Sequence, residues 1–175
     1  MRYLILLILT LLTTTAAASQ NKSVYTNLTE KTCRTIEADA EGAGWYRGLC
    51  AGAGGYRLEL LEGDLRQSIN VVAPDRKKHE LELWTNVSSA FSSLGEKAEW
   101  RVRNGRPYAL IVRFNASTSA ENPQQIVSYL VVVKISARTV CLTDIVKPAK
   151  DQNAAARRLA DESTDKPCYA RAEEQ

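Results

Sequence analysis

The alternation of apolar and polar residues constrains the fold of this chain more than any other feature of its sequence. Between residues 56 and 146, apolar side chains recur at every second position in short runs that turn residues separate. Such a period gives a strand one apolar face. Pairs of runs lie close together at residues 56–61 and 65–72, and again at 98–103 and 108–114. The pattern predicts strands joined as antiparallel hairpins.

The first hairpin has a register that its apolar faces can test. A two-residue loop at Gly63 and Asp64 joins the apolar face of one strand to that of the other. In this register Leu58 lies beside Ile69. We therefore expect a tight turn with glycine at its first position.

The second hairpin turns at Asn104 and Gly105, which together are a strong turn signal. A plain two-residue turn sets Trp100 opposite Ala109, so that an apolar face lies beside a charged one. A three-residue loop with Gly105 in the left-handed conformation pairs Trp100 with Tyr108 and restores the match. The sequence therefore predicts a β-bulge at Gly105.

The C-terminal half adds a central strand and one helix. Residues 126–135 are apolar on both faces, as in a strand buried inside a sheet, and residues 139–146 can pair with them. Asp151 can cap a helix that runs to Ser163. The apolar residues available for one face of this helix are Ala154, Ala155, Leu159 and Ala160. The fold is therefore expected to be mainly β, an antiparallel sheet or sandwich of about seven to eight strands with one short C-terminal helix.

Four cysteines limit the chemistry further. The four are Cys33, Cys50, Cys141 and Cys168. An even number indicates two disulfides in a chain that matures outside the reducing cytoplasm, and three pairings are open. We favour Cys33–Cys50 and Cys141–Cys168, because each closes a short loop and stabilises by about 3–4 kcal/mol in the chain-entropy model. A zinc site is not expected, since there is no Cys-x-x-Cys and the only histidine is distant in sequence. No metal or cofactor is predicted.

The N-terminus predicts export. Residues 3–12 are almost entirely apolar, follow Met1 and Arg2, and precede small residues that include Ala16 and Ala18. This arrangement is typical of a secretory signal over residues 1–18, and indicates a secreted or periplasmic protein. The apolar run is too short to span a membrane, which takes about 20 residues, and no transmembrane segment is expected after cleavage.

The remaining chain is expected to form one domain. Residues 19–31 are polar and predicted to be flexible, residues 32–170 form a single disulfide-bearing domain, and residues 171–175 are a tail. Within the domain, a first strand is expected at residues 33–36. The glycine-dense residues 41–55 are expected to form a loop.

Catalytic residues are hard to find in this sequence, and none is predicted. His79 lies in a charged stretch, no Gly-x-Ser-x-Gly motif is present, and oxidised cysteines offer no thiolate. A pair of carboxylates could still hydrolyse a glycan. The local clusters of acids that leave this alternative open are Glu59, Glu62 and Asp64, and Glu80 and Glu82.

Four arginines form the candidate binding surface. The outward face of the second hairpin carries or adjoins Arg101, Arg103, Arg106 and Arg113. Guanidinium groups hold carboxylates, sulfates and phosphates in two-pronged contacts, so the face could dock an anionic glycan or an acidic protein. The alternative is a solvated polar face, partly balanced by Glu96 and Glu99. A net charge of only +3 argues against nucleic acid.

Residues 55–68 with 71–75, and residues 91–102 with 109–113, resemble an uncharacterised family of secreted bacterial proteins. The resemblance implies life in a bacterial envelope or outside the cell, and it brings no activity or site residue. The sequence as a whole predicts an exported, non-enzymatic binding domain with an unknown partner. A carboxylate-dependent glycan hydrolase and a structural envelope component are the alternatives.

Overall fold

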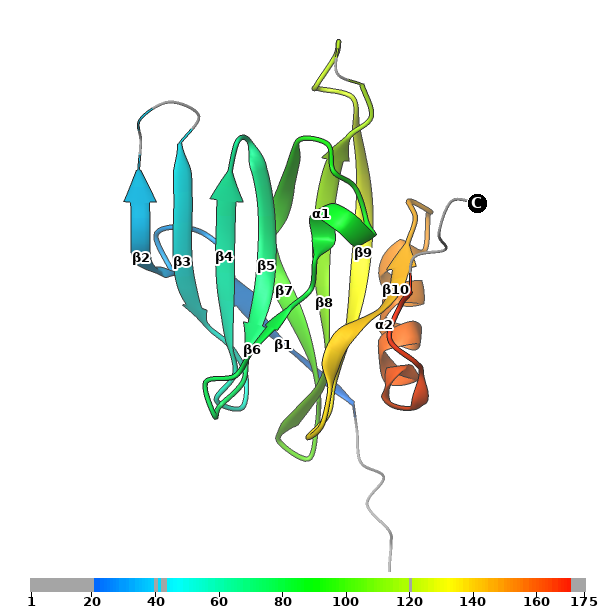
Figure 1. The fold of residues 1–175 in the computed structure, drawn as a ribbon. Coiled ribbons are helices and arrows are strands. Elements are labelled where there is room, and N and C mark those ends of the chain that lie inside the picture. Colours follow the sequence, from blue (N-terminus) through cyan, green and yellow to red (C-terminus); the bar gives the residue numbers. More distant parts are fainter. Residues whose placement is uncertain (1–20, 40, 42–43, 120, 171–175) are drawn as a thin grey trace, which may run out of the picture.

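The computed structural model describes residues 21–170 except 40, 42–43 and 120, so the predicted signal and the tail lie outside the described residues. The fold is mainly β, as predicted (Figure 1). Its elements are β1 Lys22–Asn27, β2 Arg34–Asp39, β3 Trp45–Ala51, β4 Arg57–Gly63, β5 Arg66–Val72, β6 Lys78–Glu80, α1 Leu83–Asn86, β7 Ser92–Arg103, β8 Arg106–Ser117, β9 Ile126–Ile135, β10 Val140–Val146, α2 Gln152–Asp161 and the 3₁₀ turn η1 Ser163–Asp165.

One mixed sheet of ten strands contains all of these strands, in the order β10-β9-β8-β7-β5-β4-β3-β2, with β1 paired to β7 and β6 to β5. Every pairing is antiparallel except a short parallel contact of Arg66 in β5 with Ser92 in β7. The sequence predicted seven to eight strands, and the two that it missed are β1 and β3. Both occupy stretches predicted to be flexible or a loop.

β1 lies within residues 19–31, where the polar composition gave no strand signal. Its backbone pairs with β7 along Lys22–Asn27, and only Thr26 among its side chains is buried. Thr26 donates a hydrogen bond to the carbonyl of Ala51 and accepts one from the indole of Trp100. The strand is therefore held by its ladder and by polar side-chain contacts, which a hydrophobic pattern does not reveal.

β3 runs through the glycine-dense stretch. Tyr46 and Cys50 point into the core, and Gly48 lies between them. A Cβ atom on Gly48 would collide with the Tyr46 hydroxyl, so the glycine makes room for the tyrosine ring. A residue that suggested a loop thus serves close packing inside a strand.

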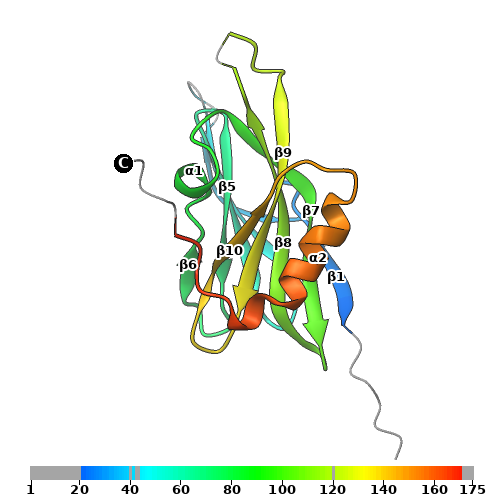
Figure 2. The ribbon, with the colours of Figure 1, turned by 90° about the vertical axis from the view of Figure 1, so that its right-hand side faces the viewer.

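The sheet bends so that one face of β3–β5 packs against one face of β7–β10 (Figures 1 and 2). Trp100 and Phe114 are the largest fully buried side chains of this core. A second cluster fills the space beneath α2 and consists of Ala109, Ile111, Leu130, Val132, Ala156 and Ala160. β9 contributes to both clusters, which confirms the prediction of a central strand buried on two faces.

The first hairpin turns one residue later than predicted. Asp64 and Leu65 form its two-residue loop, with φ angles of 51° and 57°, and Gly63 ends β4. Leu58 therefore lies opposite Val71 and not opposite Ile69. The shift of partner is two residues, so the apolar faces still coincide and the pattern could not detect the error.

The register shift predicted at Gly105 is present but lies further along the hairpin, although Gly105 is left-handed as expected, with a φ of 76°. Asn104 and Gly105 form a two-residue turn, and the register shifts later, where Arg101 and Val102 face Ala109 and Pro107. Pro107 has no N–H to donate to the ladder, so an irregularity is easily accommodated there. The shift matches the apolar faces as expected, and it turns Tyr108 toward the cluster beneath α2.

Both disulfides join the favoured pairs, Cys33–Cys50 and Cys141–Cys168. The C-terminal helix is confirmed, although Asp151 at its N-cap makes no side-chain capping bond. Its buried residues are Gln152, Ala156 and Ala160, so the predicted face that included Ala154 and Ala155 is rotated. None of the described helices is long and apolar enough to cross a membrane.

Candidate functional site

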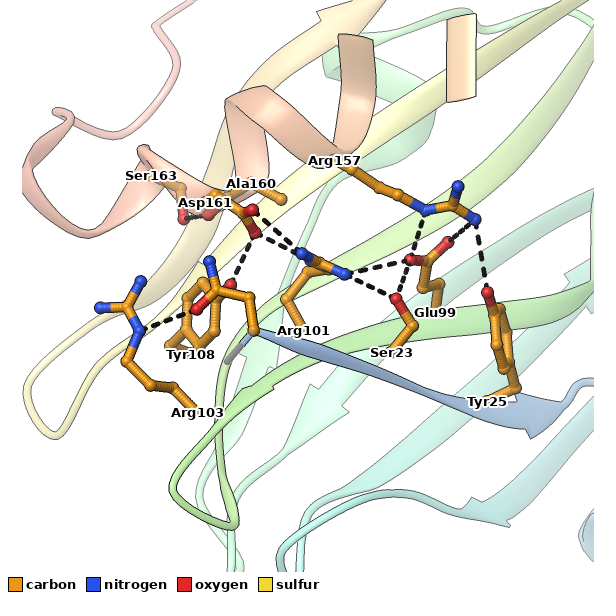
Figure 3. A network of polar contacts seen from close by, with 11 residues as sticks. Ser23, Tyr25, Glu99, Arg101, Arg103, Tyr108, Arg157, Ala160, Asp161 and Ser163 are labelled. Carbon is orange, nitrogen blue, oxygen red and sulfur yellow. Dashed lines mark hydrogen bonds and ion pairs between the residues drawn. The ribbon is translucent and has the colours of Figure 1, made fainter. Parts of the chain in front are cut away.

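The outward face of the second hairpin lies beneath α2 (Figure 2). Arg101 of β7 is only 8% exposed, and its Nε and Nη2 donate to the two carboxylate oxygens of Asp161 in α2 at 2.8 and 2.9 Å (Figure 3). A third contact joins its Nη1 to the Ser23 hydroxyl at 2.6 Å. Arg101 is therefore an anchor for the helix.

A second ion pair has the opposite polarity. Arg157 of α2 donates through Nε and Nη2 to the two carboxylate oxygens of Glu99 in β7, at 2.8 and 3.0 Å. Burial acts to raise the pKa of Glu99, but hydrogen bonds from Arg157 and Ser23 outweigh it and hold that pKa below its usual value. The two pairs lie side by side between the helix and the strand, and together they clamp α2 to β7 (Figure 3).

Tyr108 completes the clamp. Its hydroxyl donates to the Oδ1 atom of Asp161 at 2.6 Å, from the position to which the register shift turned it. Burial acts to raise the pKa of Asp161, but the hydrogen bonds from Arg101 and Tyr108 outweigh it and lower that pKa. The carboxylate is thus kept charged where the helix meets the sheet.

Arg113 holds the start of the same helix. Its guanidinium donates to Ser128 of β9 at 2.7 Å, and to Gln152 and Asn153 of α2 at 3.2 and 3.1 Å. Arg101 and Arg113 are therefore used within the chain. The sequence contained a signal for the contact between α2 and β7. Glu99 and Arg101 are two apart and share one face of a strand, while Arg157 and Asp161 are four apart and share one face of a helix, with complementary charges.

The other two predicted arginines lie at the hairpin tip. Arg103 donates to the Asn21 side chain at 3.0 Å and its guanidinium lies 4.6 Å from the centre of the Tyr108 ring. Arg106 is exposed and lines a shallow pocket beside Pro107. The structure thus does not bring the four arginines together, and only Arg103 and Arg106 remain open as binding residues.

The clamp makes the stability of the fold depend on pH in a defined direction. Because Glu99 and Asp161 have folded-state pKa values below their ordinary 4.5 and 3.8, they stabilise the fold above those values, and the contribution is lost as pH falls through the lowered values. The free energy of unfolding, measured in urea between pH 6 and about pH 2.5, should fall with acidification. Asp161→Asn should flatten the profile, and an equally steep profile in that variant would contradict the assignment.

The outer face of the other half of the sheet is not covered by α2. Residues paired across β4, β5 and β6 share this face, with Leu61 opposite Ser68 and Asn70 opposite Glu80. A pocket of about 250 Å³ lies here, which we call the cup. Its floor is formed by Leu61, Ser68 and Asn70, and its rim by Lys78, Glu80 and Trp84.

The floor of the cup contains buried polar groups. Ser68 and Asn70 are each 5% exposed. Asn70 donates to Glu59 at 3.1 Å, whereas the Ser68 hydroxyl has no hydrogen-bond partner among the described residues. The Ser68 hydroxyl is not among the fully buried side-chain atoms that lack a partner, so it is accessible from the cup and a bound group could form a hydrogen bond with it.

The rim combines an aromatic ring with charges. The Trp84 indole is 37% exposed and its orientation is set by a hydrogen bond from Nε1 to the carbonyl of Gln67 at 3.1 Å. Lys78 lies 3.6 Å from Glu80 and 3.5 Å from Glu59. Glu82, which also lines the cup, has a φ of 49°, a left-handed conformation that is uncommon for glutamate and is often found at functional sites.

The chain matches no protein-family model, no curated protein and no solved structure. Among the described residues, no group of three or more histidine, cysteine, aspartate or glutamate side chains could hold a metal ion. The cup was missed at the sequence level because its residues lie on three strands and a helix. The available signal was the pair of polar residues, Ser68 and Asn70, on one face of an apolar strand.

Proposed function

We propose that this chain is an exported, non-enzymatic binding domain whose cup holds one ring of a neutral or amino glycan. The observation that carries the proposal is the Ser68 hydroxyl, which has no partner among the described residues and is accessible from a pocket with an exposed indole on its rim. Two disulfides suit a chain that works in an oxidising compartment, which supports export.

A sugar ring is chemically complementary to the cup. It has an apolar face that can lie on an aromatic ring and hydroxyl groups that both donate and accept hydrogen bonds. Trp84 provides the ring, while Ser68, Asn70 and Lys78 provide polar contacts. A volume of about 250 Å³ lies below the range of drug-sized pockets, which favours a single ring.

The charges of the cup favour a neutral or positively charged sugar. Lys78 pairs with Glu80, and Glu82 adds a further carboxylate to the lining. Another anion would be repelled by this surplus of negative charge, whereas an ammonium group would be attracted.

Glycan hydrolysis is the second candidate, because Glu80 and Glu82 both line the cup. A hydrolase needs one carboxyl group that burial keeps protonated. The Glu80 side chain is instead 63% exposed and paired with Lys78. The arrangement therefore supports binding better than bond cleavage.

Binding to an immobilised panel of neutral, amino and acidic oligosaccharides tests the proposal. Trp84→Ala should weaken binding to neutral or amino sugars at least about tenfold, because the stacking surface is lost. Ser68→Ala should weaken it about two- to tenfold without lowering the free energy of unfolding, because no hydrogen bond within the chain is removed.

Trp45→Ala is the matched control, since Trp45 is 42% exposed and lies outside the cup. This variant should bind like the parent protein. Equal affinity for the parent, Trp84→Ala and Ser68→Ala would contradict the proposal, as would a preference for acidic sugars.

A further inference from the structure

A second pocket on the same outer face contains two arginines. It has a volume of about 420 Å³ and is lined by residues that include Arg34, Leu49, Tyr56 and Arg57. We propose that Arg34 and Arg57 bind a tetrahedral oxyanion, as carried by a phosphate or sulfate monoester. This anion site is separate from the cup and shares no lining residue with it.

The strand register places both arginines on one face. Arg34 of β2 lies opposite Leu49, and Arg57 of β4 lies opposite Ala51, so the two flank β3 from its two sides. Directly opposed residues project to the same face of a sheet, and Leu49 and Ala51 are two apart on one strand. The guanidinium groups therefore rise on either side of a shared apolar floor.

The disulfide fixes this geometry. Cys33 precedes Arg34 directly and is bonded to Cys50, which itself lines the pocket. The start of β2 is thereby tied to β3 beside the site. On the other side of the pocket, a turn at Gly54 and Gly55 leads into Tyr56 and Arg57. The two glycines have φ angles of 59° and 83° and add no side chain to the pocket.

The charges at this site are not neutralised within the described part of the chain. Neither guanidinium has a hydrogen-bond or ion-pair partner there, whereas Arg47, Arg101 and Arg157 each contact a carboxylate. Two positive groups that line one pocket favour an anion between them. Arg34 is also exposed, so that a ligand can reach it.

The number of arginines favours a tetrahedral anion. A single guanidinium can satisfy both oxygens of a carboxylate in a two-pronged contact. A phosphate or sulfate monoester has three terminal oxygens, which can accept from two guanidinium groups at once. The pair at this site therefore suits an oxyanion with more than two acceptors.

Titration of the full chain with inorganic phosphate and with inorganic sulfate, followed by calorimetry, tests this site. The double variant Arg34→Gln/Arg57→Gln should lose at least about tenfold in affinity. The control Arg138→Gln/Arg158→Gln removes the same charge from two exposed arginines outside the pocket and should bind like the parent. The proposal would be overturned if neither phosphate nor sulfate bound saturably, or if the control variant lost as much affinity as the double variant.

Sedimentation with vesicles of phosphatidic acid in phosphatidylcholine, compared with phosphatidylcholine vesicles, identifies the source of the anion, because phosphatidic acid carries a phosphate monoester. Binding that depends on Arg34 and Arg57 would support the site and assign the anion to a lipid headgroup. Binding of free phosphate or sulfate without vesicle binding would support it and assign a soluble ester. Trp84→Ala should bind phosphate and sulfate like the parent protein. The anion site and the sugar-binding cup can therefore be supported or contradicted independently of each other.

Discussion

Replacing Arg101 with alanine should lower the free energy of unfolding by about 3 kcal/mol, because it breaks a buried ion pair and removes hydrogen bonds from other polar groups. Asp161 loses two of its hydrogen bonds, and the Ser23 hydroxyl loses one. Asp161 keeps 30% of its side chain exposed and can regain some water, so the cost should lie at the lower end of the range for buried pairs.

Urea unfolding of Arg101→Ala and Arg106→Ala separates this role from a general effect of charge. Arg106 lies on the same hairpin but is exposed, so its replacement should change stability by less than about 0.5 kcal/mol. If Arg101→Ala were as mild as Arg106→Ala, α2 would not depend on the clamp for its position.

Replacing Trp100 with alanine should cost about 4 kcal/mol, the largest effect of any single change considered for this fold. Its side chain is fully buried, its ring centre lies 6.1 Å from that of Tyr56, and its indole donates to Thr26 at 2.9 Å. The substitution therefore opens a cavity between the two halves of the sheet and removes a polar contact that holds β1.

Trp45→Ala serves as the comparison. That ring is exposed, so its removal should lower the free energy of unfolding by under about 1 kcal/mol. Hydrogen exchange of β1 amides should also accelerate selectively in Trp100→Ala. A loss of less than 2 kcal/mol in Trp100→Ala, with unchanged exchange in β1, would show that this ring is not central to the core.

The elements with a regular pattern were predictable from the sequence. β9 was identified by its two apolar faces, α2 by its composition, and both disulfides by their short loops. The hairpins were located correctly, but their turns were not, because a shift of two residues preserves the apolar faces. β1 and β3 lacked a recognisable alternation of apolar and polar residues. Polar contacts hold β1 in place, and in β3 a glycine makes room for the Tyr46 ring.

The functional surfaces were less predictable than the fold. The arginines of the second hairpin were conspicuous in the sequence, yet Arg101 and Arg113 serve to seat α2. The helix covers one half of the outer face, and the other half carries the cup and the anion site. Both of these sites are formed by pairing between strands, and their residues become neighbours only when the register is known.

Nuclear magnetic resonance can show whether the cup holds a sugar ring. The best-binding oligosaccharide of the panel would be titrated into ¹⁵N-labelled protein. We expect the Trp84 indole signal and the amides of Ser68 and Asn70 to shift together and to saturate with one affinity. Saturable shifts confined to other regions of the protein, with these three signals unchanged, would contradict this expectation.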